Sequence, residues 1–176
     1  MDLTGIDLRG ANLQNATFDY ATLDGADLRS IVAFNATFIH TGMNKTYLQN
    51  AEFNRYSFSE CSGFCGEANL TNAFLSNADL TNAYLRYADL TAAYLSNADL
   101  TDADLNSADL TDAYLYNADL TDANLRNADL TNVNLRFADL TNADFSSATV
   151  TNADFSATVW SNTIWTDGVA YNTNQA

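Results

Sequence analysis

The feature that most constrains the fold is a repeat of five residues. Across residues 68–151 an alanine and, two positions later, a leucine return at nearly every fifth position, and residues 78–82 show the unit as Ala-Asp-Leu-Thr-Asn. Five residues would turn an α-helix through roughly 500°, so the leucines would not line one face of it. A long β-strand fails as well, because its inward positions recur every second residue and five is odd.

Short extended segments joined by turns satisfy the period. In such a segment the alanine and the leucine point to one side, and the residue between them points away. The sequence holds no proline and only seven glycines, so the turns must be built from Thr, Ser, Asn and Asp, whose side chains hydrogen-bond to nearby backbone. This predicts a closed coil with Ala and Leu inside, stacked at about 4.8 Å per turn.

The repeat indicates a single solenoid over residues 1–176, with one interruption. A first block covers residues 1–58, and its twelve inward centres are all apolar: Leu3, Leu8, Leu13, Phe18, Leu23, Leu28, Ala33, Phe38, Met43, Leu48, Phe53 and Phe58. The next leucine centre, Leu70, lies 12 residues after the last of these. Residues 59–69 therefore form an interruption, which we interpret as two six-residue units with Phe64 as an added centre and a bulge.

A second block covers residues 70–165 without a slip in phase. Leucine occupies every inward centre up to Leu140, and the centres that follow are Phe145, Val150, Phe155, Trp160 and Trp165. We expect this bulk to plug the last coil, because solenoids must cap their ends. The polar tail, residues 166–176, is expected to fray.

These units resemble the pentapeptide repeat family, whose signature is Ala-Asp/Asn-Leu-x-x. The match covers roughly residues 2–165 and is most similar to cyanobacterial members. The resemblance implies an all-β fold, a right-handed quadrilateral parallel β-helix with four five-residue sides per coil. At that size the chain would make about eight coils.

Four sides per coil would stack outward residues 20 positions apart into columns. One predicted acidic column contains Asp79, Asp99, Asp119 and Asp139, and another on the opposite face contains Asp89, Asp109 and Asp129. In one interpretation these carboxylates form a solvated surface that hydrogen-bonds to the turns. In another they bind cations such as Ca²⁺ weakly. A glycosidase-like carboxylate pair is disfavoured, because the same spacing recurs on every coil without a cleft.

A further interpretation treats the acidic rod as a mimic of duplex DNA, which carries one charge per about 1.7 Å of its axis. The resemblance supports this alternative, because the fluoroquinolone-resistance members of the family are acidic rods that bind DNA gyrase. The same charge argues against direct binding to nucleic acid or anionic membranes, since the chain carries a net charge of −15.

A second kind of column is aromatic. Phe74, Tyr94 and Tyr114 fall on one predicted face, and Tyr84 falls on the opposite face. Stacked exposed rings suit a protein-binding stripe, although ordinary ladder packing on a β surface explains them as well.

The two cysteines, Cys61 and Cys65, both fall in the interruption. With His40 as the single histidine, a zinc site is disfavoured. A short-range disulfide is favoured, which would place the protein in the periplasm or the thylakoid lumen. Two reduced thiols in a cytoplasmic protein are the alternative.

The sequence therefore predicts a non-enzymatic structural or protein-interaction scaffold, without cofactor or metal and with an unknown protein partner. A gyrase-binding DNA mimic is the alternative function. No apolar run approaches the roughly 20 residues that span a bilayer, so membrane insertion is not expected. The first inward residue, Leu3, follows the start of the sequence abruptly, which suggests either that a preceding segment has been removed or that this end meets another molecule, such as a second copy of the chain in end-to-end self-association.

Overall fold

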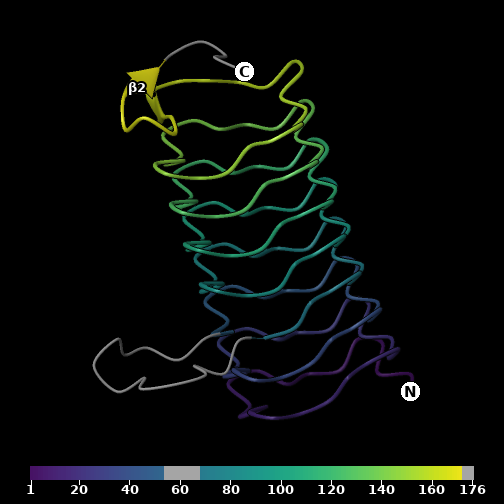
Figure 1. The fold of residues 1–176 in the computed structure, drawn as a ribbon. Coiled ribbons are helices and arrows are strands. Elements are labelled where there is room, and N and C mark those ends of the chain that lie inside the picture. Colours follow the sequence, from purple (N-terminus) through teal and green to yellow (C-terminus); the bar gives the residue numbers. More distant parts are fainter. Residues whose placement is uncertain (54–67, 172–176) are drawn as a thin grey trace.

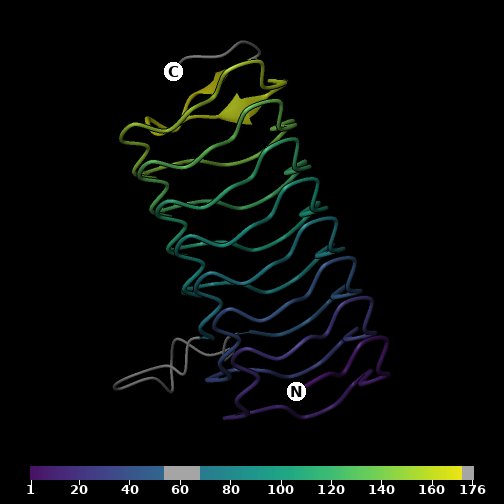
Figure 2. The same ribbon diagram turned by 90° about the vertical axis from the view of Figure 1, so that its right-hand side faces the viewer.

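The chain winds into stacked four-sided coils. The computed structural model describes residues 1–53 and 68–171. Parallel bridges join outward residues 20 positions apart, such as Asp79 with Asp99. The Asp99 N–H donates to the Ala78 carbonyl at 3.0 Å, and the Leu80 N–H donates to the Asp99 carbonyl at 2.7 Å. Figure 1 and Figure 2 show the coils following one axis from the purple N-terminal end to the yellow C-terminal end.

The corners between sides are two-residue turns. At one of them the Ala83 N–H donates to the Leu80 carbonyl at 2.9 Å, and the second corner residue, Asn82, has a φ of 57°. A positive φ at this position is typical of a type II turn and favours Gly or Asn. Asparagine is the residue that most often takes this conformation in the described corners. The predicted turn chemistry is confirmed in part: Asn supplies the left-handed backbone that glycine usually provides, whereas residues outside the predicted set, such as Tyr20, Tyr87 and Phe137, also have a positive φ at this position.

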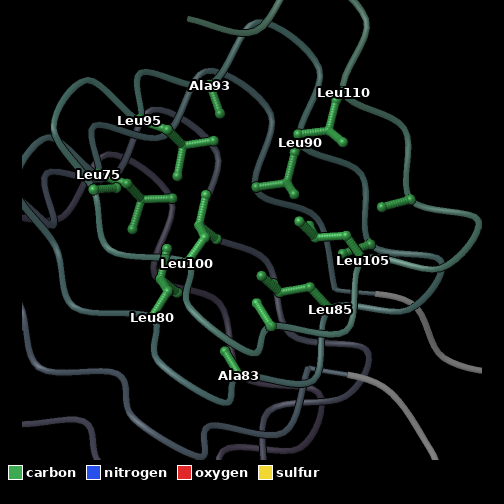
Figure 3. Packing of buried hydrophobic residues seen from close by; sticks show 14 of the residues in the cluster. Leu75, Leu80, Ala83, Leu85, Leu90, Ala93, Leu95, Leu100, Leu105 and Leu110 are labelled. Carbon is green, nitrogen blue, oxygen red and sulfur yellow. The ribbon is translucent and has the colours of Figure 1, made fainter. Parts of the chain in front are cut away.

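The interior is filled by the alanines and the central leucines. From Ala68 to Phe145 these side chains expose 1% of their surface or less. Leucines from successive sides, among them Leu75, Leu80 and Leu85, point into the common interior in Figure 3. Each fully buried leucine contributes about 1.5–3 kcal/mol of transfer free energy. The core is therefore a continuous column along the axis.

Threonine replaces the inward alanine at three buried positions. The Thr41 hydroxyl donates to the Phe18 carbonyl at 2.8 Å, and the Thr46 hydroxyl donates to the Met43 carbonyl at 2.8 Å. The Thr163 hydroxyl donates to the Leu140 carbonyl at 2.7 Å. Each buried hydroxyl thus has an acceptor, which removes most of the cost of burying it.

Aromatic residues close the C-terminal end of the core, as predicted. The rings of Trp160 and Trp165 have centroids 5.0 Å apart, and Phe155 lies 5.2 Å from Trp165. Two short strands lie at this end of the chain. The strand β1 (Thr163–Ile164) pairs antiparallel with β2 (Ala170–Tyr171). The expectation that the tail frays from residue 166 is therefore wrong as far as Tyr171.

The interruption lies between two sides that are consecutive in the coil. The Ala68 N–H donates to the Phe53 carbonyl at 3.2 Å, the same bond that closes every regular corner. Glu52 bridges Tyr84, so the register continues across residues 54–67.

This register bears on the sequence-based boundary. The described ladder passes from the side that ends at Phe53 to the side that begins at Ala68. The predicted end of the first block at Phe58 and the added centre at Phe64 stay predictions. Those two phenylalanines lie outside the described residues.

Candidate interaction surface

The acidic column of Asp79, Asp99, Asp119 and Asp139 exists as predicted, joined by parallel bridges. Each carboxylate accepts a hydrogen bond through Oδ1 from the backbone N–H two residues later. The four N–H donors are those of Thr81 (3.1 Å), Thr101 (3.0 Å), Thr121 (2.9 Å) and Thr141 (2.9 Å). These bonds stabilise the corners, which supports the turn-stabilising interpretation.

The turn itself does not require the negative charge. Asn69, Asn124 and Asn134 occupy the same outward position and accept the same bond through Oδ1, at 3.0, 3.2 and 3.2 Å. A neutral amide therefore serves the corner as well as a carboxylate does. The negative charge of the two acidic columns is therefore not needed to form the corners.

The arginines neutralise other carboxylates. Arg9 pairs with Asp7 at 2.7 Å, and Arg29 pairs with Asp27 at 2.5 Å. The hydrogen bonds from Arg9 lower the pKa of Asp7 from 3.8 to about 2. Within residues 1–53 and 68–171, no ion pair reaches the predicted acidic columns, namely Asp79, Asp99, Asp119 and Asp139 on one face and Asp89, Asp109 and Asp129 on the other.

The aromatic column forms a stacked ladder. Phe74 and Tyr94 have ring centroids 5.0 Å apart with an 8° interplanar angle, and Tyr94 and Tyr114 are 5.1 Å apart at 3°. These three side chains are 40%, 37% and 44% exposed, and we call them the aromatic stripe. Tyr84 lies two sides further round the coil, on the opposite face, as predicted.

Two further exposed rings, which the sequence analysis missed, lie at the neighbouring corner of the coil. Tyr116 and Phe137 meet edge to face at 5.3 Å, on the corner that follows the Tyr114 side. Their signal in the sequence was an aromatic residue at a corner position that is usually Ser, Thr, Asn or Asp. The sides before and after the Tyr114 side carry Asp109 and Asp119, so the stripe runs between the two acidic columns.

Three further findings concern metal ions, membrane-spanning helices and the two cysteines. Among the residues described, no group of three His, Cys, Asp or Glu side chains is placed to hold a metal ion. No described helix is long and apolar enough to span a bilayer. Cys61 and Cys65 lie outside the described residues, so their disulfide stays a prediction.

Comparison with known sequences returns one family. The family model described as "Pentapeptide repeats (8 copies)" matches residues 1–30, 65–102, 83–122 and 118–156, which is more than half of the chain. A comparison with curated proteins found no match.

Solved structures share the architecture. Rfr23, a pentapeptide repeat protein from the cyanobacterium Cyanothece 51142, is 28% identical, with a TM-score of 0.61 over 73% of this chain and 90% of its own. HetL, from the cyanobacterium Nostoc sp. strain PCC 7120, is described as involved in heterocyst differentiation regulation. It is 24% identical, with a TM-score of 0.50 over 97% of this chain and 83% of its own. A trypsin-treated form of QnrB1, a plasmid-mediated fluoroquinolone resistance protein, is 21% identical, with a TM-score of 0.54 over 89% of this chain and 66% of its own.

Proposed function

The chain belongs to the pentapeptide repeat family, and from this premise we propose that it is a non-enzymatic scaffold that binds another protein. We infer a right-handed quadrilateral β-helix of about eight coils as the rigid support. One observation carries the proposal: the stacked, exposed rings of the aromatic stripe. Contiguous exposed aromatic surface is typical of protein-binding sites, because rings bury a large area at low entropic cost.

The carboxylates support a non-catalytic role. Acid–base catalysis needs two carboxylates in different environments, so that one is protonated while the other is ionised. Here the aspartates of both acidic columns repeat one local geometry, each accepting a bond from the N–H two residues later. This repeated bond is shared by all of these carboxylates, and Asp79 additionally accepts hydrogen bonds from Gln49 Nε2 and the Thr81 hydroxyl.

The test is capture of a binder followed by reconstitution. Immobilised protein is incubated with a lysate of the source organism, retained proteins are identified, and each is produced pure. Support requires a saturable complex of defined stoichiometry between the two purified proteins. If no retained protein forms such a complex, the scaffold proposal is wrong.

Gyrase binding by DNA mimicry is the second candidate, and the surplus charge of the acidic columns favours it. The likeness to QnrB1, at 21% identity, shows the fold alone. A supercoiling assay with purified gyrase tests it. The variant Asp99→Asn/Asp119→Asn, which keeps the turns, should then lose inhibition or protection. No effect of the wild-type protein at micromolar concentration would exclude the mimic.

The compartment and the end-to-end self-association stay predictions. Sedimentation velocity across a range of protein concentrations checks the self-association, because an end-to-end contact raises the sedimentation coefficient as concentration rises.

A further inference from the structure

We propose that a gap in the outward column below Phe74 binds an arginine side chain of the partner protein. Gly42 opens the gap, the Asp24 carboxylate bounds it on one side, and the Phe74 ring bounds it on the other; we call it the Gly42 gap. The inference rests on the scaffold function proposed above and adds where the partner binds and which side chain it presents.

The stack of rings leaves its faces accessible only at its ends. An aromatic ring attracts cations at its face and not at its edge, because its quadrupole is negative on the face and positive at the rim. Tyr94 is stacked between two rings, whereas among the residues that the structure describes Phe74 stacks on one ring only. The next position of the column on the other side is Gly42, which bridges Phe74 and has no side chain. The free face of Phe74 therefore looks over glycine.

A carboxylate reaches the same gap from the coil below. Asp24 Oδ1 accepts from the Asn44 N–H at 2.9 Å and from Asn44 Nδ2 at 3.2 Å, so the side chain rises to the level of Gly42. A Cβ atom added to Gly42 would lie 3.1 Å from Asp24 Oδ1. Even a methyl group would thus crowd the carboxylate. Among the described residues, no Lys or Arg of this chain forms an ion pair with Asp24.

The chain shows a related arrangement, on two adjacent coils, that is occupied by its own arginine. Asp27 bridges Tyr47 in the next coil. The Arg29 guanidinium pairs with Asp27 at 2.5 Å, and its Cζ lies 6.0 Å from the centre of the Tyr47 ring. A carboxylate below and a ring above therefore hold one guanidinium on this scaffold. At the Gly42 gap the carboxylate and the ring are present, and no cation of the described residues pairs with this carboxylate; the proposal assigns the cation to the partner protein.

Arginine suits the gap better than lysine does. Its guanidinium is planar, stacks on a ring face and donates in its own plane to a carboxylate. The net charge of −15 and the unpaired acidic columns on both neighbouring faces would draw a basic segment to this side of the rod.

Titration with a short peptide, followed by amide NMR, tests the proposal. The probe is acetyl-Gly-Arg-Gly-Arg-Gly-amide, compared with the lysine peptide and with the citrulline peptide, which has arginine's shape without its charge. The arginine peptide should shift the Gly42 and Phe74 amides saturably and bind about tenfold tighter than either comparison peptide.

Matched variants separate the gap from general attraction to an acidic protein. Asp24→Asn and Phe74→Asn should each weaken the arginine peptide by about tenfold. Asp19→Asn is the matched charge control, because Asp19 accepts the Ile39 N–H at 3.0 Å just as Asp24 accepts an N–H 20 residues later in the sequence. This variant removes the same charge and should change the affinity for the arginine peptide less than twofold. Tyr84→Asn is the control for the loss of an exposed aromatic ring. Asparagine is tolerated there, because the column of outward residues that contains Tyr84 also contains Asn124.

Three results would overturn the proposal: equal losses in the Asp24 and Asp19 variants, equal affinities for arginine and lysine peptides, or no saturable shift at Gly42. Line broadening centred on Gly42 as protein concentration rises without peptide would assign the gap to a second copy of the chain and would also overturn it. The scaffold function and the Gly42 gap can be refuted independently of each other. A reconstituted partner that binds Asp24→Asn and Phe74→Asn as well as wild type refutes the gap alone, whereas the lack of any partner refutes the scaffold.

Discussion

The Ala68 N–H donates to the Phe53 carbonyl at 3.2 Å and so joins two consecutive sides of the coil across residues 54–67. Elsewhere the same bond closes a corner of two residues, as at Leu80 and Ala83. The backbone on both sides of the interruption is therefore already in the geometry of a regular corner.

Replacement of residues 54–67 by Thr-Asn should leave the fold intact. Because the flanking sides already meet, the shorter connection should keep the circular dichroism spectrum and raise the free energy of unfolding by roughly 1–2 kcal/mol through loop closure. Urea unfolding measures this. Replacement by Thr alone is the control, and it should destabilise the protein because it breaks the five-residue phase. Equal stability of the two variants would contradict the register described above.

Leu110→Asp should collapse the rod. Leu110 is fully buried, and an aspartate there would place an unpaired charge in the core at a cost of more than about 4 kcal/mol. Thermal melting followed by circular dichroism measures the loss. Asp109→Asn, one residue away on the outside, should leave the melting temperature nearly unchanged. A Leu110→Asp protein with a wild-type melting temperature would refute the inward placement of Leu110.

Ala92→Asn should stabilise the protein. Ala92 has a φ of 54°, a left-handed conformation that costs an alanine about 1 kcal/mol and that Asn tolerates. We expect a gain of about 0.5–1 kcal/mol, measured by urea unfolding. Ala92→Val should lower stability, because a β-branched side chain is strained at positive φ. A gain with valine would show that the backbone conformation is not the cause.

Asp7 should titrate at about pH 2, because the Arg9 side chain donates to it from Nε at 2.9 Å and from Nη2 at 2.7 Å. The folded pKa lies below the ordinary value of 3.8. The stabilisation of the fold by the ionised Asp7 carboxylate and Arg9 is therefore present above pH 3.8 and is lost as the pH falls toward 2. Arg9→Ala should raise the pKa of Asp7 toward 3.8 in a carboxyl NMR titration. Arg29→Ala should have a smaller effect, since Arg29 is the weakest of the causes; a larger one would contradict the assignment.

Cys61 and Cys65 should be disulfide-bonded in protein purified without reductant. Titration of free thiols on the denatured protein should find none, and two should appear after reduction. Two free thiols before reduction would contradict the disulfide and, with it, the argument for the periplasm or thylakoid lumen.

Most of the coil can be predicted from the sequence because its signals are local. The five-residue period identifies which side chains point inward, and the turn residues follow from the lack of proline and the scarcity of glycine. The stacking of Phe74, Tyr94 and Tyr114 was predictable too, since no interruption separates them. The roles of Thr41 and Thr163 were not, because each hydroxyl bonds a carbonyl of the preceding coil, 23 residues back.

The sequence by itself determined the inward and outward faces, because alternation within a short extended segment depends only on neighbouring residues. The tertiary structure decided which sides lie above one another across the interruption. Phe58 satisfies the local period, and only the pairing of Glu52 with Tyr84 shows that the coil passes from Phe53 directly to Ala68. The same pairing places Gly42 beneath Phe74, 32 residues away. The Gly42 gap depends on hydrogen bonds between coils, and no local pattern specifies those across an insertion.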